Sequence, residues 1–326
     1  MNPKMPNSPI QKPTRSVIKW LLDSDPSIRW QVLRDLTKES DEAVAAERSR
    51  VATEGWGAQL LNHQNTNGSW GDGNSAPVWS STLQTMQLLW NMGLDPISEQ
   101  ARKAISLVRD EVTWGPQWGN SPFFEGEVEP CINGRVLGLG AYFGETSGRL
   151  LERLLGEQLK DGGWNCETEN GSVRSSFHTT ICVLEGLLEY EKAKGATAAV
   201  TAARVRAQEY FLERRMFRSL STGEVVAMDK KTGQPAKWTL FSFPTTWHYD
   251  LLRGLDYLRS AGIDPDERVA EAVELTAKKQ HQNGRWPRQN IHPDPVGLDM
   301  EGATGTASRW NTLRALRVLD WYSRKN

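Results

Sequence analysis

The sequence predicts an all-α fold in which an inner and an outer ring of helices form an α/α toroid. Three segments share the spacing Gln-x3-Gly-x-Trp, at residues 64–70, 158–164 and 280–286. The same motif at distant points of a chain indicates internal repeats. Helical stretches that are apolar on most sides also alternate with amphipathic ones, and the former are typical of buried positions. We therefore expect about six inner and about five to six outer helices.

The hydrophobic periodicity is helical along almost the whole chain. Apolar stretches predict inner helices at residues 26–37, 77–92, 130–143, 176–193, 244–260 and 306–322. Charged, amphipathic stretches predict outer helices at residues 97–111, 148–159, 197–215 and 266–281, with further helices at 16–23, 41–52 and 55–63. Turn residues such as Gly93, Gly144 and Gly195 separate the helices. Residues 222–243 are the plausible β-ribbon, a small insertion into the repeat.

The two ends of the chain carry a related motif, which predicts how the ring closes. The pattern Arg-Trp-polar-x-Leu-Arg-x-Leu occurs at residues 29–36 and again at residues 309–316. An open stack of repeats would expose the same apolar face at both ends and would need polar caps. We therefore expect the first and the last inner helix to be neighbours.

The composition of the chain argues against several classes of function. A net charge of −1 over 326 residues and an isoelectric point near 6.6 predict no nucleic-acid partner. No apolar run has the ~18 residues of a membrane span, so we expect no integral membrane segment. Residues 1–14 are polar and proline-rich, which predicts a disordered arm before a single domain at 15–326. The start lacks the apolar core of a signal peptide, so we expect a cytoplasmic protein. Three cysteines, an odd number, disfavour a disulfide scaffold.

The three Gln-x3-Gly-x-Trp motifs, each after an amphipathic helix, resemble the QW repeats of squalene–hopene cyclases. The relatives of those enzymes are the terpenoid-cyclase and protein-prenyltransferase toroids. The resemblance extends from residue 16 to residue 322. It implies a toroid with a ligand cavity inside the inner ring, at the end where the inner helices begin. It also implies an isoprenoid or another apolar small molecule as ligand, although a fold does not fix an activity.

Cysteine and histidine side chains lie near the starts of two inner helices. Cys131 begins one of them, Cys166 follows the second QW motif, and His178 begins the next inner helix. Two thiolates and an imidazole are typical zinc ligands, and three protein ligands with an open position mark a catalytic zinc. Prenyltransferase β-subunits carry Asp-x-Cys and His at similar places, and this resemblance implies Glu129 as a further ligand. Cys182 is a reserve ligand. The alternative is that these are buried packing residues.

The catalytic motifs of the prenyltransferases and of the cyclases have no clear counterpart in this sequence. Prenyltransferases place Arg and Lys ahead of the Asp-x-Cys to hold a diphosphate, but residues 123–129 here are acidic and would repel it. The D-x-D-D motif of the cyclases is absent, and its nearest relative contains Asp299 and Glu301. A desolvated carboxylic acid there could stay protonated, or it could be an ordinary solvated carboxylate. His248 and Asp250 are the other acid–base candidates, although a spacing of two places them on different helix faces.

Aromatic and polar side chains near the starts of the inner helices are the candidate cavity lining. They are Trp79, Asn133, Trp247, Tyr249, Arg309 and Trp310. Aromatic faces can stabilise a developing cation or stack on an apolar ligand, but each of these rings is equally compatible with a core position. The segment 218–243 is the longest departure from the repeat, and long insertions are often lids. Trp238, Phe241 and Phe243 would then close over the pocket.

Three interpretations of function remain open at this point. The first is a zinc-containing enzyme with an aromatic-lined cavity that acts on an apolar small molecule. The second is a non-catalytic binding or interaction module of the same fold. The third is a metal-free cyclase that uses Asp250, Asp299 or Glu301 as the acid.

Overall fold

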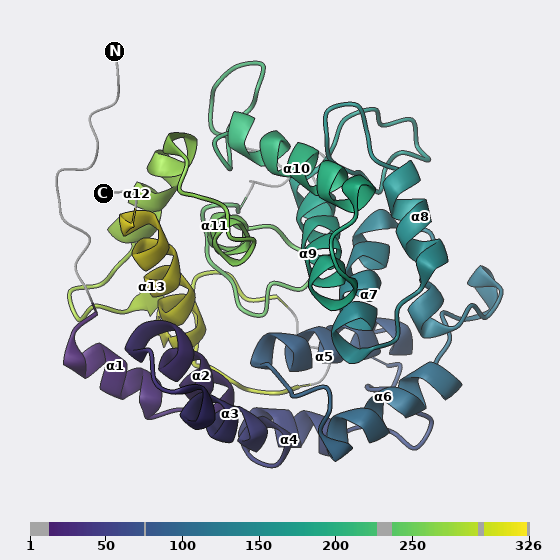
Figure 1. Ribbon diagram of the computed structural model, residues 1–326, viewed down its shortest axis with the longest axis horizontal. Coiled ribbons are helices and arrows are strands. Elements are labelled where there is room, and N and C mark those ends of the chain that lie inside the picture. The colour runs from purple at the N-terminus through teal and green to yellow at the C-terminus, as the bar shows by residue number, and fades with distance from the viewer. Residues whose placement is uncertain (1–12, 75, 227–236, 293–296, 325–326) are drawn as a thin grey trace.

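The inner helices form a ring, and the outer helices surround it (Figure 1). The computed structural model describes residues 13–74, 76–226, 237–292 and 297–324, and it confirms the all-α toroid. The inner helices are α2 (Pro26–Val32), α5 (Val78–Met92), α7 (Pro130–Phe143), α9 (Phe177–Lys194), α11 (Leu251–Ser260) and α13 (Arg309–Ser323).

The outer helices are amphipathic and bury one face against the inner ring. They are α1 (Arg15–Leu22), α4 (Gly55–Asn62), α6 (Glu99–Glu111), α8 (Gly148–Gly156), α10 (Ala198–Glu213) and α12 (Ala270–Lys278), and α3 (Asp41–Ser49) packs beside α2. In α6 the buried residues are Ala101, Ala104, Ile105 and Val108, which is the spacing of one helix face. Among the described residues, no helix combines the length and the apolarity that crossing a bilayer requires.

The structure differs from the sequence prediction in two segments. The helix expected from residue 244 begins at Leu251, because Asp250 caps it by accepting a hydrogen bond from Arg253 N at 2.8 Å. The preceding residues form a loop at the end of the ring where the inner helices begin, which we call the mouth of the ring. The ribbon expected at 222–243 lies partly outside the described residues, and its described part takes part in two isolated bridges, Arg218–Val225 and Ser242–Asn290. The small antiparallel sheet consists instead of β1 (Trp286–Pro287) and β2 (Ala307–Ser308).

The QW motifs tie each outer helix to the next inner helix. In the second motif, Trp164 Nε1 donates to Leu154 O on α8 at 2.7 Å, and Trp164 N donates to Thr180 Oγ1 on α9 at 3.0 Å. Gln158 Nε2 binds Gly162 O at 2.7 Å and so closes the turn between them. The first and third motifs repeat all three bonds. The three tryptophans are fully buried, so the motif is structural.

The ring closes between the first and the last segments of the chain, as the repeated end motif predicts. Gln31 Oε1 on α2 accepts a hydrogen bond from Arg317 Nη2 on α13 at 2.7 Å. In the third QW motif, a Cβ added at Gly284 would lie 2.9 Å from Val17 Cγ2 on α1. The corresponding glycines of the first two motifs pack against α6 and α10 in the same way. Helix α1 therefore completes the outer ring.

Helices α7 and α9 cross at unusually close range because glycines line their contact. A Cβ added at Gly186 would lie 2.1 Å from Gly134 O, and one added at Gly134 would lie 2.6 Å from Val183 Cα. Neither distance is sterically possible, so only glycine fits at either position. This close crossing sets the separation between the starts of α7 and α9, where the candidate site lies.

Candidate metal centre

Two cysteines and a glutamate meet at the N-terminal end of α7. The ligand atoms of Glu129, Cys131 and Cys166 all lie within 4.8 Å of one another. Cys131 Sγ is 3.4 Å from Glu129 Oε2. Among the residues that the structure describes, no other trio of His, Cys, Asp or Glu side chains meets this distance condition. The group combines the two residue types, thiolate and carboxylate, that commonly bind zinc.

The local structure explains why these three side chains converge. Pro130 occupies the first position of α7, where a missing N–H costs nothing. Glu129 precedes it as the N-cap residue, but its side chain makes no capping bond, so the carboxylate remains available to a ligand. Cys166 lies two residues after the anchored Trp164. Its thiol is 3.3 Å from Thr179 Oγ1 in the first turn of α9.

The two thiols are electrostatically unequal. The hydrogen bond from Cys131, assisted by Thr179, lowers the pKa of the Cys166 thiol. The same bond together with burial raises the pKa of Cys131 well above its usual value. Cys166 is therefore the thiol of the pair that ionises first. Binding of a cation would release both protons, because thiolates are the ligating form.

Of the predicted Cys131–Cys166–His178 set, the structure brings the two cysteines together but does not place His178 within the same 4.8 Å group. Its Nδ1 accepts a hydrogen bond from Tyr249 N at 2.7 Å, and its ring packs edge-on against Trp247 with centroids 5.3 Å apart. The imidazole is thus oriented toward the loop before α11. The glutamate implied only by the family resemblance occupies the third position instead.

His248 belongs to a stack of rings at the same mouth. It lies between Trp247 and His292, with both pairs of ring centroids 3.7 Å apart. Thr246 Oγ1 lies 2.8 Å from its Nδ1. Burial and the neighbouring imidazoles lower the pKa of His248 to about 2 and, with burial again the larger cause, that of His292 to about 4. No sequence motif marks the loop that carries His292, so this residue had no signal in the sequence.

The carboxylates proposed as acids have structural partners or lie in solvent. Asp250 is buried, and its Oδ2 accepts from Ser242 N and Oγ at 3.1 and 2.9 Å. Glu301 accepts from Ser308 Oγ at 2.6 Å and from Trp310 N at 3.0 Å, and so caps α13. Burial raises the pKa of Glu301. Asp299 is exposed.

A further carboxyl group, which no sequence pattern indicated, lies beside the candidate centre. Glu127 is buried, and its Oε1 accepts a hydrogen bond from Glu129 N at 2.7 Å. Burial raises the pKa of Glu127 to about 7. Asn133, predicted to line a cavity, is fully buried and binds the backbone of Glu127 through Oδ1 (2.8 Å) and Nδ2 (3.0 Å). Its role here is to hold the acidic loop against α7.

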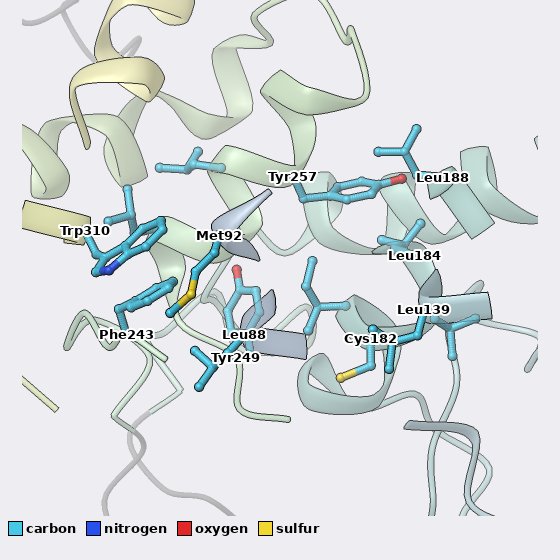
Figure 2. Close-up of a cluster of buried hydrophobic side chains, with 14 of the residues drawn as sticks. Leu88, Met92, Leu139, Cys182, Leu184, Leu188, Phe243, Tyr249, Tyr257 and Trp310 are labelled. Carbon is cyan, nitrogen blue, oxygen red and sulfur yellow. The ribbon is translucent and has the colours of Figure 1, made fainter. Parts of the chain in front are cut away.

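Some of the aromatic residues predicted to line a cavity lie in the hydrophobic core, and others lie at the mouth of the ring. Trp310 is 2% exposed and stacks on Phe243 with ring centroids 4.0 Å apart. Figure 2 shows both in a cluster of buried side chains that also contains Tyr249. Trp79 is half-buried and packs against two further tryptophans, Trp114 and Trp118.

Two candidate residues lie at the surface of the ring rather than among the core rings. Trp247 is 39% exposed at the mouth. Arg309 stacks over the Trp20 ring and donates to Trp20 O, which places it against α1. Of the predicted lid residues, Phe241 and Phe243 are buried and Trp238 packs on Phe177 at 4.4 Å between ring centroids.

Buried charges between α7, α9 and α11 are a second feature that sequence patterns did not indicate. Arg253 Nε and Nη2 donate to Glu185 at 2.8 and 2.6 Å. Arg135 lies one turn after Cys131 on α7 and is 3% exposed, and burial lowers its pKa. A lone Arg in an apolar helical stretch carries no sequence signal for its partner on another helix.

Comparisons with known proteins give distant structural similarity. No protein-family model and no curated protein sequence matches the chain. The apo structure of the type II terpene cyclase MstE from Scytonema is 17% identical, with a TM-score of 0.45 over 93% of this chain and 88% of that one. A variant of that cyclase was solved with geranylgeranyl dihydroxybenzoate as substrate, at 16% identity and a TM-score of 0.44 over 92% of this chain and 87% of that one.

A glycosyl hydrolase family 88 protein from Bacteroides vulgatus is similar to the same degree. It is 12% identical, with a TM-score of 0.45 over 95% of this chain and 97% of that one. Proteins of two different activities thus match equally well, so the comparison assigns neither activity to this chain.

Proposed function

We propose that this chain is a zinc-dependent enzyme that acts on an apolar small molecule at the mouth of the ring. The convergence of Glu129, Cys131 and Cys166 carries the proposal. Zinc held by three protein ligands keeps a fourth position for substrate or water. Bound there, it would polarise a substrate group or activate a nucleophile.

The chain's own residues prepare the centre for such chemistry. Glu129 is exposed and Cys131 is buried, so the open side of the group faces the solvent at the mouth. Glu127, whose pKa burial raises to about 7, lies next to the group and is suited to hold or release a proton near neutral pH. Arg153 Nη2 donates to Val128 O at 2.8 Å and so holds the acidic loop in place from α8.

Apolar residues around the centre support an apolar ligand. Large hydrophobic side chains are exposed at Val128 (39%), Val173 (78%), Trp247 (39%) and Ile291 (43%). Val128 adjoins Glu129, and the other three lie on loops that carry or contact the mouth residues. Their positions in the chain, beside Glu129, on the loop after Cys166, and next to His248 and His292, are the support for an apolar ligand. The same apolar residues would also suit a non-catalytic binding module. Such a module would bind the ligand without converting it.

Metal analysis of the purified chain tests the centre. We expect about one zinc per chain after reconstitution, and its loss in Cys131→Ser and Cys166→Ser. Cys182→Ala is the matched control, because Cys182 is a free, fully buried cysteine outside the group. His178→Gln should keep the metal. A folded chain that takes up no zinc, or that keeps it in both serine variants, would show that the thiols are packing residues.

A turnover screen with isoprenoid alcohols and other apolar compounds then separates enzyme from binding module. Turnover should require zinc, disappear in Cys166→Ser and persist in Cys182→Ala. Saturable binding of such a compound without conversion would favour the binding module instead.

A further inference from the structure

A cleft of about 460 Å³ lies at the end of the ring opposite the candidate metal centre. It is formed where α11 and α13 end and where the π-helix η1 (Leu33–Thr37) follows α2. Its volume lies within the range of small-molecule sites. The residues that line it are Asp35, Lys38, Arg259, Gly262, Ile263, Asp264, Pro265, Arg317, Asp320, Trp321 and Arg324. The proposed function does not use this end of the molecule.

The floor of the cleft is built around a buried arginine. Arg317 is 7% exposed. Its Nη2 donates to Gln31 Oε1 at 2.7 Å and pairs with Asp35, while its buried Nε has no hydrogen-bond partner among the described residues. Arginines in the last turn of a helix commonly interact with the negative end of the helix dipole. Arg317 lies well before the end of α13 at Ser323, so this explanation does not apply to it.

The arginine side chains on the floor of the cleft outnumber the carboxylates that pair with them. Asp35 serves two guanidinium groups, because Arg34 also donates to it from Nε and Nη2 at 2.7 and 2.9 Å. The nearby Arg259 has its own carboxylate, Asp256, at 2.7 Å from Nε. Two arginines therefore share the single charge of Asp35. Burial, together with repulsion from Arg259 and Arg34, outweighs the attraction of Asp35 and Asp256 and lowers the pKa of Arg317 to about 10.

The rim adds basic groups that can reach a bound molecule. Lys38 is exposed and forms no ion pair with any residue that the structure describes, and Arg324 pairs with Asp320 at 2.7 Å on the surface. Asp264, also exposed, is the opposing charge on this rim. Among the lining residues, four basic groups thus face three acidic ones.

The backbone of the cleft is held in a specific form. Asp35 lies on a π-helix, a rare conformation that is frequent at functional sites. The π-helix ends at Lys38 in the left-handed conformation, with φ of 59°. On the opposite wall, Trp321 Nε1 donates to Ile263 O at 2.7 Å. The wall and the floor are thus fixed before any ligand binds, which lowers the entropic cost of binding.

We propose that this cleft is a second binding site that takes an oxyanion group, as phosphate or carboxylate, of a small molecule. The oxyanion would lie against the Arg317 guanidinium and between the Lys38 and Arg324 side chains, with Trp321 and Ile263 forming the apolar wall. Arginine suits such a group because its planar fork matches two oxygens at once. Asp35, within the motif at residues 29–36, and Arg317, directly after the motif at residues 309–316, thereby belong to both the ring seam and the floor of this site.

Calorimetric titration of the full chain with inorganic phosphate, and separately with citrate, tests the proposal at constant ionic strength. The two probes distinguish a phosphate from a carboxylate ligand. The double variant Lys38→Glu/Arg324→Glu changes exposed rim residues and should leave folding intact. We expect it to lower the affinity for the better probe by about tenfold or more, the scale of one charge-assisted contact. Arg317→Gln should lower it further.

The control variant Arg102→Glu/Lys103→Glu makes the same charge change on the exposed face of α6 and should bind as the unmodified chain does. Cys131→Ser should also bind normally, which separates this site from the proposed metal centre. Failure of the unmodified chain to bind either probe saturably would overturn the proposal. Equal affinity of the rim variant and the α6 control would overturn it as well.

Discussion

Polar side chains at the starts of the inner helices have two different roles. Ser176 and Ser308 accept hydrogen bonds from Thr179 N and Asn311 N, respectively, and so cap α9 and α13. Such capping is ordinary for serine. Cys131 is the second residue of α7, after Glu129 at the N-cap and Pro130, and its thiol contacts Glu129 and Cys166. The serines thus cap helices, whereas the Cys131 thiol contacts two other candidate metal ligands.

The stacked imidazoles make the stability of the native chain sensitive to acid. The folded-state pKa of His292 is lowered from 6.5 to about 4, so the native state resists a proton that the unfolded chain accepts. The stabilisation of the folded state that comes from keeping His292 neutral is therefore fully present above about pH 6.5. It is lost progressively as the pH falls toward about 4. We expect the thermal midpoint of His292→Gln to fall less between about pH 7 and about pH 5 than that of the unmodified chain.

The exposed His63 at the end of α4 provides the comparison, because His63→Gln makes the same substitution away from the stacked rings. Groups such as Glu127, whose pKa is raised, act in the opposite direction. For this reason the quantity to measure is the difference in thermal midpoint between the variant and the unmodified chain at each pH. The pH dependence of the unmodified chain alone combines opposing groups. Parallel curves for His292→Gln and the parent would contradict the assignment.

At the scale of helices, the glycine-lined crossing of α7 and α9 determines the geometry of the candidate centre. Cys131 is in the first turn of α7, and Thr179, which contacts Cys166, is in the first turn of α9. Any increase in the distance between the two helices would separate the ligand atoms. The pair Gly134 and Gly186 keeps that distance short because neither has a side chain at the contact.

Gly186→Ala should therefore destabilise the chain although alanine is the better helix former. Its Cβ would lie 2.1 Å from Gly134 O, and overpacking of this kind costs about 1–3 kcal/mol. Gly156→Ala is the control, because nothing lies within 4 Å of a Cβ at that helical position. There the change should be neutral or stabilising by up to about 1 kcal/mol. Urea denaturation followed by circular dichroism compares the two, and equal midpoints would refute the close crossing.

On the scale of the whole molecule, the first and last inner helices hold the ring closed through a charged seam. Arg317 on α13 pairs with Asp35 after α2, and both side chains are largely buried, at 6% and 15% exposure. Burial opposes ionisation of Asp35, but Arg317 and Arg34 together hold its pKa well below the usual range. Contacts between the two ends of a chain are typical of a closed ring and absent from an open solenoid.

Asp35→Asn should weaken ring closure by about 3 kcal/mol, because it leaves the Arg317 charge buried without its counter-ion. Asp110→Asn is a matched control, since Arg109 and Asp110 form the same adjacent pair but lie exposed on the surface. The control should keep the midpoint of the parent. The measurement is thermal unfolding of the full chain, and a similar midpoint for both variants would show that the seam contributes little to stability.

Much of this architecture could be predicted because its signals are local. The period of apolar residues marks each helix, and the Gln-x3-Gly-x-Trp spacing reports a turn with two local hydrogen bonds, Gln158 to Gly162 and Trp164 to Leu154. The related motifs at residues 29–36 and 309–316 predicted neighbours, and Arg317 does bind Gln31. The start of α11 was predicted too early, because the residues before Asp250 have helical composition but form a loop.

By itself, then, the sequence determined the alternation of inner and outer helices, the closure of the ring and the segments that meet at its mouth. Only the tertiary structure decided that Glu129 rather than His178 joins the two cysteines, and that a charged cleft lies at the other end. The physical reason is the difference between interactions that are local in the sequence and those that join distant segments. Helix periodicity and capping depend on residues a few positions apart, whereas a ligand set depends on how separate loops and helices are positioned to within a few ångströms.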